Sequence, residues 1–139
     1  MADYTAIRDG LATRLETVST FLTVHATVPS RIVAPSAVVV PGRPVAVYHD
    51  SMVGTSGSLT VFNFELVCAV QSMTEEFAQD ALDDLISGAA SVPAAIEADP
   101  TLGGAATTCQ VRQAVDYGVV AFADTEFIGA RFLVEVIAR

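Results

Sequence analysis

The run from Ser58 to Ser72, SLTVFNFELVCAVQS, constrains the fold more than any other stretch of the chain. Its side chains alternate between two sets, and period-two alternation sends such sets to opposite faces of a β-sheet. The first set is wholly apolar: Phe62, Phe64, Leu66, Cys68 and Val70. The second set mixes apolar and polar residues: Leu59, Val61, Asn63, Glu65, Val67 and Gln71. At about 3.3 Å per residue the strand would reach roughly 45 Å, so we expect it to extend beyond its own domain and to meet a partner chain.

Helical patterns flank this strand. Apolar residues recur at three- and four-residue steps in two long segments, and a short third segment also favours a helix: 3–18, 72–86 and 91–98. Asp3 can cap the first helix and Ser91 the third, because a short polar side chain accepts a hydrogen bond from the amides of a first turn. Either Ser72 or Thr74 can cap the second helix.

Shorter extended segments make up most of the remaining chain. Alternating or apolar runs predict strands over five further ranges: 21–28, 32–41, 46–48, 107–117 and 126–137. Four prolines between residues 29 and 44 leave room only for short pieces in that region, near a sheet edge where a missing amide is tolerated. The stretch from Gly118 to Asp124 is typical of a turn.

This order of elements predicts an α+β fold in one domain that spans residues 1–139. We expect an antiparallel or mixed β-sheet with long hairpin strands and two main α-helices packed on one face. The opposite face would be about half apolar, which is typical of a surface that contacts another subunit. The candidate interface residues on that face are Leu59, Val61, Glu65, Val67, Arg131, Leu133 and Ile137.

The segment 49–57, HDSMVGTSG, has the composition of a flexible loop, with two glycines and three hydroxyl side chains. It joins two extended segments and would therefore form the tip of a long hairpin. Such a loop either orders against a neighbouring subunit or stays mobile in solvent. On the first alternative, its candidate docking residues are His49, Asp50, Met52, Val53 and Thr55.

The charge of the chain argues against binding to phosphate backbones. The net charge is −9 and every cation is an Arg, whereas proteins that bind nucleic acids present basic patches. The N-terminus has neither a basic nor an apolar segment of the kind found in secretory signals, so we expect no signal peptide and no membrane partner.

Motifs of catalysis and cofactor binding are missing from the sequence. It contains no phosphate-binding loop, no dinucleotide fingerprint, no HExxH and no paired CxxC, so we expect no enzyme activity, no cofactor and no metal. His49 and Asp50 form a possible base and orienter, although a catalytic site also needs groups that converge in space. Cys68 and Cys109 are expected to be small core residues.

Two segments of the C-terminal half carry a resemblance to a known family. SVPAAIEADPTLGGAATTCQVRQAVDYG and the later FIGARFLVEV resemble the tail-terminator family of long-tailed bacteriophages, especially forms from phages of actinobacteria. The resemblance is specific over residues 91–135 and looser over the N-terminal half, which has an opening helix, a Pro-rich passage and a long hairpin.

The resemblance implies a structural protein of the virion tail or neck, assembled in the host cytoplasm and without catalysis. Copies of such a chain form a hexameric ring that caps the tail tube protein, ends tube growth and offers a surface to a head completion or stopper protein. Genomic DNA would pass through the lumen without specific binding, which suits an acidic chain. Two alternatives remain: another connector, stopper or tail-tube protein of the same particle, or a small hydrolase or ligand-binding module with a cleft near His49.

Overall fold

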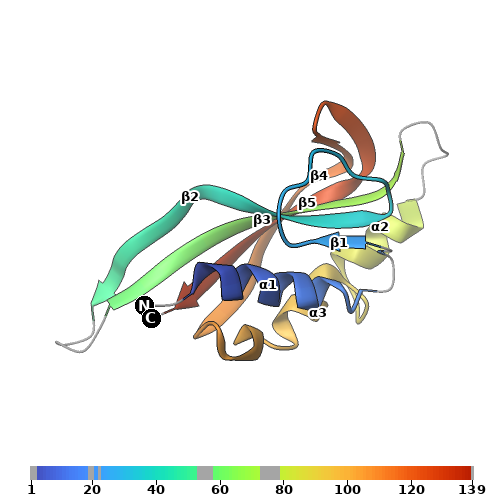
Figure 1. Cartoon of the computed structure of the whole chain (residues 1–139). Coiled ribbons are helices and arrows are strands. Elements are labelled where there is room, and N and C mark those ends of the chain that lie inside the picture. Colours follow the sequence, from blue (N-terminus) through green and yellow to red (C-terminus); the bar gives the residue numbers. More distant parts are fainter. Residues whose placement is uncertain (1–2, 19–20, 22, 53–57, 73–78, 139) are drawn as a thin grey trace.

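A computed structural model gives the fold and describes residues 3–18, 21, 23–52, 58–72 and 79–138. Within these residues, five strands form one sheet in the order β1-β2-β3-β5-β4. The elements in chain order are α1 (Tyr4–Leu15), β1 (Thr23–His25), β2 (Ser36–Met52), β3 (Ser58–Ser72), α2 (Gln79–Ile86), α3 (Val92–Glu97), the 3₁₀ turn η1 (Leu102–Gly104), β4 (Thr108–Phe122) and β5 (Thr125–Ala138). Figure 1 shows the helices on one side of the sheet.

The predicted α+β class is confirmed, and the sheet is mixed. β1 runs parallel to β2, whereas β2 with β3, β3 with β5, and β5 with β4 are antiparallel pairs. The long strand has the predicted bounds, Ser58–Ser72, and lies at the centre of the sheet between β2 and β5. Its place there explains why one of its faces is wholly apolar, since that face is covered by the helices.

The prediction of short pieces around the prolines was wrong. The chain from Ser36 to Met52 is a single strand of 17 residues that passes through Pro41 and Pro44. In the described part of the chain, β1 pairs with residues 36–38 of β2 and reaches no further. Both prolines therefore lie where this edge of β2 has no described partner that needs their missing amide hydrogen. The register between β2 and β3 shifts between Pro41 and Ala46, which accommodates the irregular backbone.

The predicted loop 49–57 was also too long at its start. Residues 49–52 belong to β2, because Ser51 and Met52 pair with Leu59 and Ser58 and continue the ladder. Residues 53–57 lie outside the described residues. In Figure 1 the β2–β3 hairpin runs past the start of α1 and projects from the layered part of the molecule.

The turn between the last two strands is shorter than the predicted range 118–124 and lies at the end of that range. β4 continues to Phe122, and the turn consists of Ala123 and Asp124, with φ of 51° and 63°. Two successive positive φ values are the geometry of a tight hairpin turn. The predicted turn at Gly118 is instead a bulge, since the β4–β5 register shifts between Val115 and Gly118 and Gly118 has a φ of 110°.

The predicted caps of the first and third helices are confirmed. The side chain of Asp3 accepts hydrogen bonds from the amides of Thr5 and Ala6 at 3.0 and 3.3 Å. The Ser91 hydroxyl accepts from the Ala94 amide at 3.2 Å and donates to the Gly88 carbonyl at 2.8 Å. The second helix is described from Gln79 onward, so the choice between its two candidate caps lies outside the described residues.

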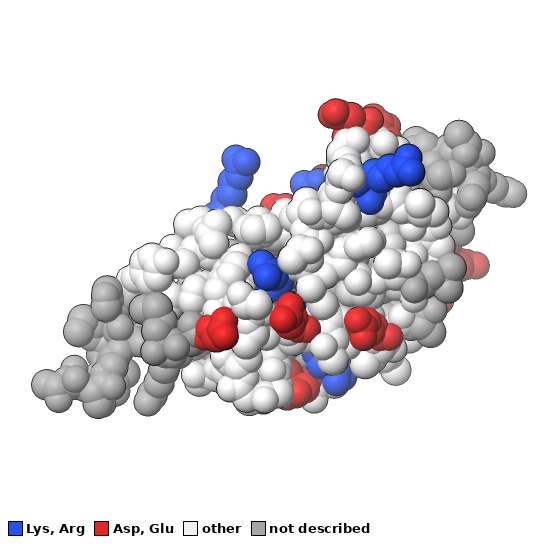
Figure 2. All heavy atoms as spheres, in the orientation of Figure 1, with Lys and Arg blue, Asp and Glu red and all other residues white. Residues whose placement is uncertain are grey.

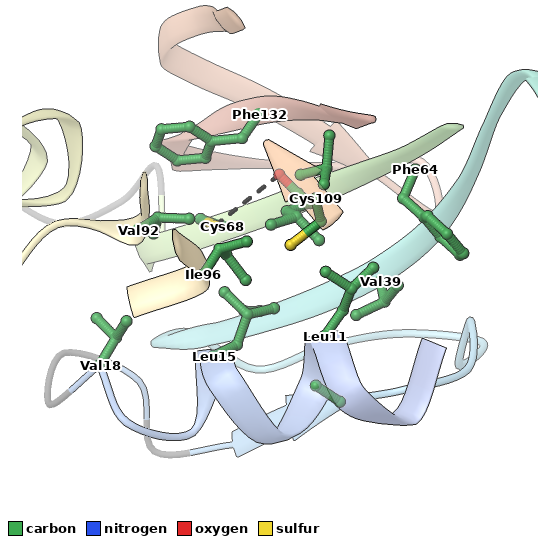
Figure 3. Packing of buried hydrophobic residues seen from close by; sticks show 14 of the residues in the cluster. Leu11, Leu15, Val18, Val39, Phe64, Cys68, Val92, Ile96, Cys109 and Phe132 are labelled. Carbon is green, nitrogen blue, oxygen red and sulfur yellow. Dashed lines mark hydrogen bonds between the residues drawn. The ribbon is translucent and has the colours of Figure 1, made fainter. Parts of the chain in front are cut away.

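The main core lies between the helices and the sheet (Figure 3). Leu11 and Leu15 of α1, and Val92 and Ile96 of α3, pack against the inner side chains of the sheet. The inner side chains of the two central strands are buried as predicted: Phe62, Phe64, Leu66 and Cys68 of β3, and Ile128, Ala130, Phe132, Val134 and Val136 of β5.

Candidate functional site

The side of the sheet away from the helices is covered over only part of its length. A second apolar cluster covers that part, and its members come from the segment before β2, from β2 and β3, and from the end of the β4–β5 hairpin: Ile32, Val38, Val67, Ala69, Val120 and Phe127. Figure 1 shows the hairpin end and the segment between β1 and β2 lying on this side of the sheet. We call this half the covered end.

Two of the candidate interface residues are buried. Val67 is 3% exposed because it belongs to the covered end, and Val61 is 8% exposed. Arg131 contacts its own chain, because its guanidinium lies 3.3 Å from Asp116. Parts of the chain distant in sequence cover Val67, and the assignment of the seven side chains to a subunit interface stays a prediction.

The other candidate interface residues lie on the uncovered half of this side of the sheet: Leu59, Glu65, Leu133 and Ile137. The β3–β5 register pairs Asn63 with Glu135 and Glu65 with Leu133. These side chains are partly exposed and alternate with the buried core residues of the same strands. We call this surface the open face: Leu59, Asn63, Glu65, Leu133, Glu135 and Ile137.

A hollow of about 280 Å³ lies on the open face. Its walls come from four strands, β2, β3, β5 and β4, and include Arg43 and Arg112 at the flanks. Gly42 contributes to the hollow because it has no side chain: a Cβ atom there would lie 2.8 Å from the carbonyl carbon of Asn63. β2 and β3 therefore approach closely at this point.

The charges around the hollow are ordered by strand. The carboxylates of Glu65 and Glu135 lie on the two central strands, and the exposed guanidinium groups of Arg43 and Arg112 lie on the flanking strands. Within the described residues, the one ion pair joins Arg131 to Asp116, so none of these four groups is in an ion pair. On the side of the molecule that faces the viewer in Figure 2, broad uncharged areas separate small groups of charged side chains.

The β2–β3 hairpin carries apolar side chains that the sequence interpretation did not single out. Val45 and Tyr48 are 47% and 61% exposed, and Val47, which pairs with Val61, is 37% exposed. The alternation Val45-Ala46-Val47 was the available signal. We call Arg43, Val45 and Tyr48 the hairpin patch.

The candidate docking residues remain a prediction. The backbone of His49, Asp50 and Met52 lies in β2, but their side chains, with Val53 and Thr55, lie outside the described residues. The same holds for the alternative of a catalytic cleft near His49.

The two cysteines are buried core residues, as predicted. Burial raises the pKa of Cys109 to about 11, with a further contribution from the charges of Glu97 and Asp99. Complete burial raises the pKa of Cys68 further, and its Sγ lies 3.9 Å from the Leu66 carbonyl oxygen (Figure 3). Because the thiolate is the reactive form, neither thiol is primed as a nucleophile near neutral pH.

No group of three or more His, Cys, Asp or Glu that could hold a metal ion occurs in the described part of the chain. Over the same residues, no helix has the length and apolar character needed to span a membrane. A scan against models of protein families and searches of curated proteins and of solved structures found no match for the chain.

Proposed function

We propose that this chain is a structural protein of a phage virion, of the tail-terminator type, which forms a ring on the end of the tail tube. The ring ends tube polymerisation and offers its other side to a head completion or stopper protein. The observation that carries the proposal is the open face, an uncovered sheet surface. It mixes Leu59, Leu133 and Ile137 with carboxylates that form no ion pair within the described residues. Such a surface is typical of subunit contacts.

The projecting β2–β3 hairpin supports the same proposal. The hairpin projects from the layered part of the molecule (Figure 1). It also carries exposed apolar side chains, which a neighbouring subunit can contact. A contact between two different surfaces of the same chain is heterologous, and heterologous contacts generate rings when the rotation closes.

The net charge of the chain supports the passage of DNA through the lumen of the proposed ring without binding. Copies of a chain with a net charge of −9, arranged around a channel, would repel DNA phosphates and let a genome pass without binding. The resemblance of residues 91–135 to tail terminators is a further, independent support.

Mixing the chain with the tail tube protein of the same particle tests the proposal. We expect tubes that shorten as the ratio of this chain to tube protein rises, with extra density at one end in electron micrographs. Long tubes formed by this chain alone would instead favour the second candidate, a tail-tube protein. Tubes of unchanged length without end density would contradict the terminator role.

A further inference from the structure

We propose that the end of the β4–β5 hairpin, residues 119–128, is a flap that opens along a crease in the sheet. The closed flap hides sheet surface that continues the open face, so its opening would enlarge the surface available to a partner subunit. That use of the flap rests on the proposed self-assembly, whereas the opening itself is a property of the single chain.

The crease follows a row of small residues that crosses four strands. The members of the row pair with one another in the order β2, β3, β5 and β4: Ser36, Ala69, Gly129 and Gly118. The register shifts at this row in two strand pairs. One shift lies between Ala69 and Gln71 of β3, and the other lies between Val115 and Gly118 of β4. Because bulges bend the strands that contain them, the sheet changes direction along this row.

Beyond the crease the sheet folds back over its own outer side. Val38 and Val67 are a cross-strand pair two positions before the row, and Val120 and Phe127 are a cross-strand pair two positions after it. All four side chains are at most 5% exposed and belong to one buried cluster. Figure 1 shows the end of the hairpin curled toward this side of the sheet. The flap is therefore closed in this structure.

The backbone of β4 is shaped for this bend. Asp116 and Gly118 have φ values of 58° and 110°. A Cβ atom added at Gly118 would meet no described atom within 4 Å, so the backbone conformation alone requires glycine there. A side chain at Gly118 would thus strain the closed crease without disturbing its packing.

Two contacts fix the residues that form the bulge of β4. The Asp116 carboxylate lies 3.3 Å from the guanidinium of Arg131, and these side chains are 50% and 26% exposed. The Tyr117 hydroxyl donates a hydrogen bond of 2.7 Å to the carboxylate of Asp83 in α2. Exposed ion pairs contribute little stability. The apolar cluster under the flap is also separate from the main core and smaller than it. Such a weakly held unit opens before the rest of a molecule unfolds.

The hidden surface continues the open face. Val67 lies two positions from Glu65 on β3, so both side chains point to the same side of the sheet. Glu65 belongs to the open face, whereas Val67 and its cross-strand partner Val38 lie under the flap. Opening would add these apolar side chains to the surface that a partner subunit can contact.

Hydrogen exchange of the unmodified protein, followed by NMR, tests the opening. Phe127 and Ile128 lie in the flap, and residues 132–136 lie on the other side of the crease in the same strand. Both groups pair with β3 and with β4, so their amides are comparable. We expect the amides of Phe127 and Ile128 to exchange at least about tenfold faster, relative to their rates in an unfolded chain, than those of residues 132–136.

Gly118→Ala should speed the exchange of the flap amides by a further factor of about ten, because alanine is strained at this φ. The amides of residues 132–136 should keep their rates. Gly104→Ala is the matched control, since Gly104 has a φ of 97° and a Cβ atom there would also meet no described atom within 4 Å. It lies in η1 and should leave the flap amides unchanged.

A thiol placed under the flap gives a second readout. Val67→Cys puts a thiol at a site that is 3% exposed while the flap is closed. An aromatic disulfide reagent should modify this thiol well before the buried Cys68, and about tenfold faster again when Gly118→Ala is added. Cys68 should react only when the whole protein unfolds, because it lies in the main core.

The outcomes separate this inference from the proposed function. If the flap amides and residues 132–136 exchange at equal relative rates, or if Gly118→Ala speeds both groups equally, the sheet opens only as a whole and the flap is wrong. Equal modification rates of the introduced thiol and Cys68 would contradict it too. Copies that assemble without a separate opening would leave the ring standing, and a flap that opens in a chain that never assembles would contradict only the ring.

Discussion

Gly129 lies where β5 passes closest to β3. A Cβ atom added at this position would overlap the carbonyl oxygen of Cys68, a rigid backbone atom in the central strand. The two strands can accept a side chain there only by moving apart, which would disturb the pairing of Ala69 with Gly129 and of Cys68 with Ala130.

We therefore predict that Gly129→Ala lowers the free energy of unfolding by about 3 kcal/mol, the upper range for overpacking a close contact. Urea unfolding followed by circular dichroism measures the change. Glu126→Ala, an exposed substitution on the same strand, should stay within about 0.5 kcal/mol of the unmodified protein. Equal stability of the two variants would show that β3 and β5 are further apart than described.

Cys109 gives a prediction of pH dependence. Burial, followed by the charges of Glu97 and Asp99, raises the pKa of its thiol from 9.0 to about 11. The unfolded chain loses this proton near pH 9 while the folded chain keeps it, so the stabilisation is complete below pH 9 and is lost as the pH rises toward 11.

The free energy of unfolding of the unmodified protein should therefore fall between pH 9 and 11. The free energy of unfolding of the Cys109→Ala variant should fall less over the same range. Urea unfolding at several pH values measures how the free energy of unfolding of each protein depends on pH. The Cys109→Ala variant also controls for other groups that titrate in this range, since it keeps all of them. Identical slopes for the two proteins would contradict the burial of this thiol.

Among the elements, the β4–β5 hairpin determines which half of the outer sheet side is exposed. Phe127 is 5% exposed and packs at the covered end with Val120 and Val67. Val119 lies on the same hairpin but is 49% exposed. The two residues therefore report on whether the hairpin end is packed down on the sheet.

We expect Phe127→Ala to destabilise the protein by about 3–5 kcal/mol, the usual cost of removing a buried aromatic side chain. Val119→Ala should change stability by no more than about 0.5 kcal/mol. Thermal unfolding of both variants measures the difference. A small effect of Phe127→Ala would mean that the covered end contributes little to the folded state.

The elements also differ in how far the sequence predicts them. β3 was predicted to the residue because its alternation is long and its apolar face is uninterrupted. β2 was predicted as fragments, because the sequence does not reveal that its neighbour β1 ends opposite Val38 and leaves Pro41 and Pro44 on a free edge. The final turn was predicted too long, because Ala123 and Asp124 adopt positive φ without a glycine and Gly118 suggested an earlier start.

The candidate surface was predictable only in part. Alternation correctly assigned Glu65, Leu133 and Ile137 to the outer side of the sheet. It could not show that Val67 is covered, because its cover comes from residues around Ile32 and Val120, far away in sequence. The hollow was also not predictable, since it depends on the missing side chain of Gly42 and on four strands meeting.

For the whole molecule, assembly should depend on the open face. Leu133 lines the hollow and is partly exposed. We predict that Leu133→Asp reduces ring assembly while the monomer stays folded, because the new carboxylate would be buried in an apolar contact beside two others. Light scattering measures the loss of assembled mass, and circular dichroism measures the fold.

Val33→Asp is the matched control. Val33 is 78% exposed and lies outside the open face, so the same charge added there should leave the assembled mass unchanged. If both variants assemble as the unmodified protein does, the open face is not the contact.

The most direct test of self-assembly combines electron microscopy with native mass spectrometry of the purified chain. We predict that the chain forms a closed annulus with an open centre and the mass of several copies of the chain. A protein that has the mass of one chain over the whole accessible concentration range, with no annular particles, would contradict it.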